Sequence, residues 1–128
     1  MAGEIAARPP GGYILDLIHR AYGFDPWEAF LRVELGEAPP LPSGPKRVAG
    51  VWMFHPGPGV VASVGGLDAA KRVPGVRVAR VRLEPGRRVG PRLGTGEDRG
   101  RVVVVGPDAP TVRERLRRAH DAIRIRMA

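Results

Sequence analysis

Apolar residues near the start of the chain recur at the spacing of two amphipathic helices. In "YILDLIHRAY", residues 13–22, the apolar side chains fall largely along one helical stripe, and Gly23 follows where a left-handed C-cap is favoured. In "FDPWEAFLRVELG", residues 24–36, Asp25 is placed to cap a helix and Pro26 suits its first turn. We therefore predict two successive helices, each with one buried face.

The period of the apolar pattern changes after residues 37–45, a proline-rich stretch that we predict to be an extended connector. Residues 47–54 and 59–64, "RVAGVWMF" and "GVVASV", are short runs rich in β-branched and aromatic side chains. The alternating Pro and Gly residues between them favour a turn, so the two runs predict a β-hairpin. Trp52 and Phe54 have the same parity and are expected on one face of their strand.

The middle of the chain alternates between helix and strand signals. Residues 65–75 fit one or two helical turns bounded by glycine. In residues 76–84, "VRVARVRLE", apolar and basic residues alternate, but the apolar positions change parity midway. This change predicts a β-bulge near Ala79 and Arg80. Residues 85–100 predict a long Gly-rich loop, and "RVVVVG" after it predicts a buried strand.

A last helix is predicted at residues 111–126, where apolar residues recur at helical intervals and "TVRE" has the spacing of a capping box. This order of elements predicts an α+β fold: two N-terminal helices followed by a small antiparallel sheet of about four strands, with the C-terminal helix packed on it. We divide the chain into a helical arm, residues 1–45, and an α+β domain, residues 46–128.

Composition narrows the function classes. Of the 128 residues 43% are hydrophobic, enough for a core, and there is no cysteine, which excludes disulfides, thiolate metal sites and a cysteine nucleophile. No apolar run approaches the length of a membrane span, and the first residues lack the plan of a signal peptide. We therefore expect a cytoplasmic protein with no membrane partner.

The formal charge of +8 is unevenly distributed, because the first 43 residues carry −3 and the remainder +11. Clustered arginines favour nucleic-acid binding, but only two of the 21 basic residues are lysine, a bias that a GC-rich coding sequence also produces. The densest basic patch is interpreted either as a solvated sheet face or as an anion-binding surface. It comprises Arg77, Arg82, Arg87, Arg88 and Arg92.

Histidine and serine patterns give no support to metal or hydrolase chemistry. His19, His55 and His120 lack the spacing of a zinc site. No order of Ser, His and Asp has the context of a nucleophile elbow, so we assign no catalytic residue.

Two stretches together resemble a known family. The segment "EIAARPPGGYILDLIHRAYGFDPWEAFLRVELGE" resembles the closing segment of the ATP-grasp fold in carboxylate-amine ligases, a Glu-x-Asn-x-Arg strand followed by a Gly-rich turn and a helix. The rest, from "GVWMFHPGPGVVASVGGLDAA" to "GRVVVVGPDAPTVRERLRRAHDAIRI", resembles the C-terminal domain that follows it. The resemblance covers essentially the whole chain and implies an ATP-dependent ligase.

The resemblance implies roles for two residues at the start of the chain. Glu4 matches the carboxylate that bridges two Mg²⁺ ions at the ATP phosphates, and Arg8 matches an arginine that reaches the phosphates. Ala6 stands where many members have asparagine, the second magnesium ligand, and alanine has no donor atom. The matching segment is therefore a reduced metal site.

The remaining ATP-binding parts of the family, here called the ATP-grasp body, precede this segment, and "GTGEDRG" at residues 94–100 matches neither GxxxxGK[ST] nor GxGxxG. We therefore expect a detached or truncated C-terminal module, inactive and without cofactor alone, that uses ATP and Mg²⁺ only when a body subunit completes it. We also expect a homodimer, since two apolar helix faces would lack their cover. The alternatives are a dimeric interaction module and a basic nucleic-acid-binding protein.

Overall fold

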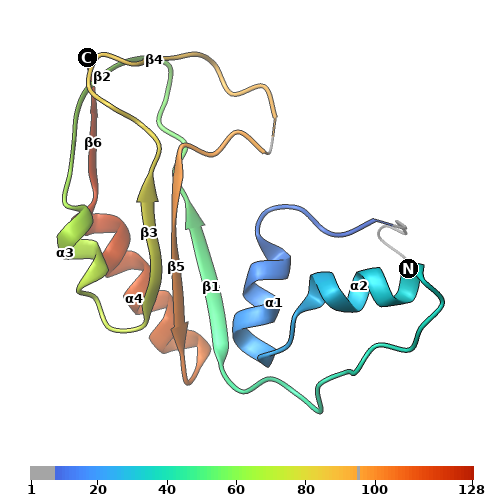
Figure 1. The fold of residues 1–128 in the computed structure, drawn as a ribbon. Helices are drawn as coiled ribbons and strands as arrows, with labels where there is room; N and C mark the ends of the chain where they lie inside the picture. Colours follow the sequence, from blue (N-terminus) through green and yellow to red (C-terminus); the bar gives the residue numbers. More distant parts are fainter. Residues whose placement is uncertain (1–7, 95) are drawn as a thin grey trace, which may run out of the picture.

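The fold begins with two short helices, and its strands and remaining helices come after a long connector (Figure 1). The computed structural model describes residues 8–94 and 96–128. In chain order the elements are α1 (Ile14–Tyr22), α2 (Pro26–Glu34), β1 (Val48–Met53), β2 (Gly59–Gly65), α3 (Leu67–Lys71), β3 (Val76–Val81), β4 (Arg88–Val89), β5 (Gly100–Gly106), α4 (Ala109–Ala122) and β6 (Arg124–Met127). The predicted α+β class is confirmed, with antiparallel strands and two N-terminal helices.

The local signals at the two N-terminal helices are confirmed. Gly23 closes α1 in the left-handed region with a φ of 75°. The Asp25 side chain caps α2 by accepting hydrogen bonds from the backbone N–H groups of Trp27 and Glu28 at 2.9 and 3.3 Å. Both ends therefore follow from short-range chemistry.

The strands form two sheets, where the sequence predicted one. The first sheet has the order β1-β5-β3 and the second has the order β4-β2-β6, and neighbouring strands pair antiparallel in both. The predicted hairpin of β1 and β2 is therefore wrong. Residues 54–58 include two prolines, which lack the N–H that a ladder needs, and β1 pairs instead with the buried β5.

The last helix differs from the prediction at both ends. Asp108 is the N-cap, accepting from the N–H of Thr111 at 2.8 Å, so the predicted capping box at Thr111 is wrong. Hydrogen bonding with Thr111 holds the pKa of Asp108 below its ordinary value. At the other end α4 stops at Ala122, and residues 124–127 form β6 because they pair with β2.

The core lies between the first sheet and α4. Val102 and Val104 of β5 are fully buried in a cluster with Leu116 and Ala119 of α4. Gly50 of β1 allows this close packing, since a Cβ there would lie 2.8 and 2.9 Å from side-chain atoms of Leu116 and Val112. A smaller cluster of Val61, Leu83 and Val89 supports the second sheet.

The opposite face of the first sheet is the one that α1 covers. Val103 alternates with Val102 and Val104 along β5 and is also fully buried, although it lies outside the α4 cluster. In Figure 1, α1 lies next to β1 while α4 passes behind β3 and β5. The sheet therefore has α4 on one face and α1 on the other.

A β-bulge in β3 decides which of its side chains face α1. The bulge lies between Val76 and Val78, so the predicted position near Ala79 and Arg80 is wrong by a few residues. Beyond it Ala79 pairs with Val102 and belongs to the α4 side, while Arg80 pairs with Arg101. Two arginines thus stand directly opposite each other on the face toward α1.

The N-terminal arm exposes several large apolar side chains. Trp27, Leu31 and Val33 of α2 are more than half exposed, at 55%, 59% and 56%. Within the described ranges, none of the helices combines the length and the apolar character needed to cross a lipid bilayer. The division of the chain near Pro45 stays a prediction.

Candidate anion site beside helix α1

The residues that the resemblance assigns to magnesium and phosphate lie at the start of the chain. Glu4 and Ala6 fall outside the described residues, so Glu4 stays a prediction. Arg8 is exposed and borders, with Leu15, Phe30 and Glu34, a cavity of about 420 Å³ between the chain start and the two N-terminal helices. Arg8 therefore lies at an opening that α1 and α2 frame.

The five arginines of the predicted patch are spread over several segments. Arg77 lies near the start of β3, Arg82 directly follows that strand, and Arg87 and Arg88 lie at β4 in the second sheet. Arg92 donates to the carbonyl of Gly94 at 2.9 Å. Arg82 pairs with a buried carboxylate, and anion binding by the others stays a prediction.

That carboxylate belongs to Asp98, which the sequence analysis did not single out. Asp98 is 4% exposed and is the one buried charged residue in the part of the chain that the structure describes. The Arg82 Nη2 atom lies 2.7 Å from each carboxylate oxygen and also donates to the Asp98 carbonyl at 2.9 Å. The Tyr13 hydroxyl donates to Oδ2 at 2.7 Å. Asp98 thereby joins the loop before β5 to Tyr13, the N-cap residue of α1.

Tyr13 is held in an unusual conformation at this junction. It follows the Gly11-Gly12 turn with a φ of 67°, the one positive φ of a non-glycine residue among those described. The Arg101 guanidinium carbon lies 4.1 Å from the centre of the Tyr13 ring, a cation–π contact. These two contacts, with Asp98 and Arg101, offset the cost of the left-handed backbone. We call Tyr13, Arg82, Asp98 and Arg101 the Asp98 cluster.

The Asp98 cluster carries more positive than negative charge. Arg101 makes no ion pair with any residue in the described ranges, and its buried Nε lacks a hydrogen-bond partner. Arg80, its cross-strand partner, is exposed beside it. A motif search could not find this arrangement, because Tyr13 and Asp98 are 85 positions apart.

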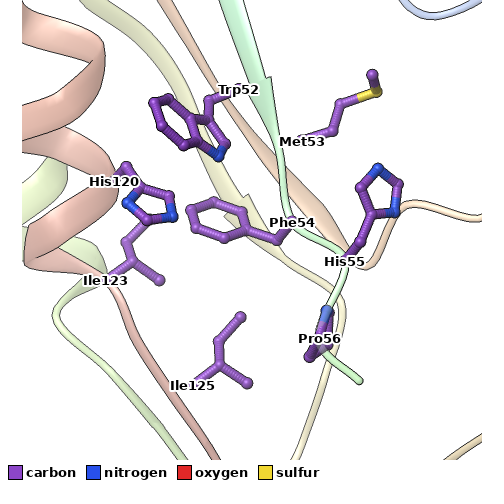
Figure 2. Close-up of a pocket in the computed structure, with 8 residues that line it drawn as sticks. All are labelled: Trp52, Met53, Phe54, His55, Pro56, His120, Ile123 and Ile125. Atoms are coloured by element: carbon purple, nitrogen blue, oxygen red, sulfur yellow. The ribbon is translucent and has the colours of Figure 1, made fainter. Parts of the chain in front are cut away.

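A second hollow lies at the C-terminal end of β1, where Figure 2 shows an aromatic lining. Its volume is about 430 Å³, and the His120 ring lies 4.3 Å from that of Trp52 and 5.3 Å from that of Phe54. Trp52 and Phe54 thus share a face, as predicted. His120 contacts Asp121 at 3.0 Å, and no group of three or more metal-binding side chains occurs within residues 8–94 and 96–128.

Comparisons with known proteins identify the class. The family model described as L-amino acid ligase C-terminal domain 2 matches residues 51–128. The crystal structure of L-amino acid ligase from Bacillus licheniformis superposes with a TM-score of 0.73 at 17% identity, covering 91% of this chain. Phosphoribosylglycinamide synthetase from Anaerococcus prevotii gives 0.69 at 12% identity, again over 91% of this chain. A comparison with curated proteins finds no match.

The chain therefore has the fold of the C-terminal region of an ATP-grasp ligase, as the resemblance implied. More particularly, it belongs to the L-amino acid ligase C-terminal domain 2 family. It spans 30% of the length of each of the two solved structures. At 17% and 12% identity, the superpositions show a shared fold alone.

Proposed function

We propose that this chain forms one wall of the active site of an ATP-dependent ligase and that an ATP-grasp body forms the rest. The family match is the observation that carries the proposal. Arg8 supports it, because this arginine lies exposed at the opening framed by α1 and α2. In this assignment Glu4 holds Mg²⁺ and Arg8 contacts a phosphate, while substrates bind mainly to the body.

The wall alone is too small to hold a nucleotide. Pockets for small ligands bury most of the ligand's surface, and the Arg8 cavity is lined by a few side chains from two short helices. An acyl-phosphate reaction also needs a dry site with fixed dipoles around the developing charge. We therefore expect neither ATPase nor ligase activity from the 128-residue chain in isolation.

The test is to add an ATP-grasp body taken from a ligase of the same family and to measure Mg-ATP binding by calorimetry. The mixture should bind Mg-ATP, and Glu4→Ala should weaken that binding about tenfold or more, because the carboxylate that would hold Mg²⁺ at the phosphates is lost. Glu114→Ala, a surface change on α4, is the matched control and should leave binding unchanged. Equal binding by the Glu4 and Glu114 variants would contradict the assignment.

We further propose that the chain forms a homodimer when no body is present. Its α2 exposes Trp27, Leu31 and Val33, and an apolar face of this kind favours association. Light scattering at high micromolar concentration should give twice the mass of one chain, and Leu31→Glu should shift the protein toward the monomer. A wild-type monomer under these conditions would contradict the dimer.

A further inference from the structure

The face of the first sheet beside the N-terminus of α1 carries three arginines, and one of them pairs with the Asp98 carboxylate. Arg80 and Arg101 are direct cross-strand partners on β3 and β5. Arg82 lies two positions after Arg80, and its contact with Asp98 places it on the same face as Tyr13. Since Asp98 compensates the charge of one arginine, the three arginines and Asp98 together keep a surplus of two positive charges.

The pairing of Arg80 with Arg101 is unfavourable in the protein alone. Like charges placed directly opposite on neighbouring strands destabilise a sheet. Neither guanidinium has an ion pair within the described ranges, and Arg101 Nε is buried without a hydrogen-bond partner. An anion between the two guanidiniums would relieve the repulsion.

The surrounding contacts fix part of this site in advance. Tyr13 packs against the Arg101 guanidinium at 4.1 Å, and Asp98 holds both Tyr13 and Arg82. Arg80 is exposed, so an anion can reach the pair from solvent. Planar guanidinium forks suit oxyanions because they donate parallel hydrogen bonds to two oxygens.

We propose that Arg80 and Arg101 form a binding site for a phosphate dianion, positioned by the Asp98 cluster. The dianion follows from the surplus of two charges, since a phosphate monoester carries about 1.5 to 2 negative charges near neutral pH. The site rests on contacts within the chain and needs neither Mg²⁺ nor an ATP-grasp body. Its failure would therefore leave the proposed ligase role untouched.

The experiment is an NMR titration of the chain with inorganic phosphate at constant ionic strength, following backbone amide and arginine ¹³Cζ resonances. We expect saturable shifts at Arg80, Arg101 and Tyr13, with a Kd on the order of 10 mM for a partly solvated arginine pair. Arg80→Gln and Arg101→Gln should each weaken binding about tenfold. Arg80→Gln carries the test if Arg101→Gln disturbs folding, because Arg80 is exposed.

Arg77→Gln is the matched control, since it removes one exposed arginine from the same strand, at the bulge and without a partner on β5. It should bind phosphate within about twofold of the wild type. Equal weakening by Arg77→Gln and Arg80→Gln would overturn the site in favour of general charge attraction. Equal binding of acetate would overturn the preference for a dianion, and the absence of saturable shifts would overturn the site altogether.

Discussion

Replacing Asp98 with alanine is expected to lower the free energy of unfolding by about 2–3 kcal/mol, through the loss of a buried carboxylate and its charge-assisted hydrogen bonds. The Asp98 side chain is 2% exposed, whereas its partner Arg82 is 44% exposed and can return to water, which keeps the cost below that of a fully buried pair. Chemical denaturation measures the change.

The same variant should loosen the start of α1. The Tyr13 hydroxyl loses its acceptor, and the left-handed backbone at Tyr13 then depends on the Arg101 contact alone. Amide exchange in the first turn of α1 should become faster than in α4. Asp68→Ala is the control, because Asp68 is 86% exposed and lies 3.6 Å from Lys71, so its loss should cost no more than about 0.5 kcal/mol. Similar losses from both variants would show that Asp98 does not fasten α1.

Gly66→Ala should lower the free energy of unfolding by about 3 kcal/mol or more, because backbone strain and a steric overlap combine at this position. Gly66 has a φ of 82°, and an added Cβ would overlap the Ala122 carbonyl oxygen and lie 3.3 Å from the Ile123 Cα. Neither neighbour is a side chain that can rotate away, so α4 or β2 has to move. The contact between the end of β2 and the end of α4 should therefore open.

Gly86→Ala separates the two effects. Gly86 has a similar φ of 86°, but nothing lies within 4 Å of the position that its Cβ would take. In this variant the free energy of unfolding should fall only by the conformational cost of a left-handed alanine, about 1 kcal/mol. If thermal denaturation gives equal losses for both variants, the close approach of Gly66 to Ala122 is not a feature of the folded protein.

Sequence patterns predicted those parts of the fold that depend on neighbouring residues. The cap at Asp25 and the left-handed Gly23 are both formed within one helical turn. The wrong predictions concern segments whose secondary structure or strand pairing depends on residues that are distant in the sequence. Residues 124–127 continue a helical pattern in the sequence, but pairing with β2, some sixty residues earlier, makes them a strand. The hairpin was wrong for the same reason, since β1 finds its partner in β5.

Among the candidate site residues, too, the sequence predicted only those that belong to a local motif. Glu4 and Arg8 were found because the resemblance supplies a motif in which they are four residues apart. Asp98 lies in a Gly-rich loop that matches no motif. Its structural role depends on the hydrogen bond from Tyr13, which is far away in the sequence. The cross-strand position of Arg80 and Arg101 depends on a bulge whose place the alternation of "VRVARVRLE" did not fix.

In the proposed ligase role, the Arg8 wall is one part of a larger nucleotide site. Calorimetric titration of the purified 128-residue chain with Mg-ATP, with no body present, tests this claim most directly. The account predicts no saturable Mg²⁺-dependent binding with a Kd of about 1 mM or tighter, because one wall cannot enclose the nucleotide. Tight, saturable binding of Mg-ATP by the isolated chain would contradict the account and would make this chain a complete nucleotide-binding protein.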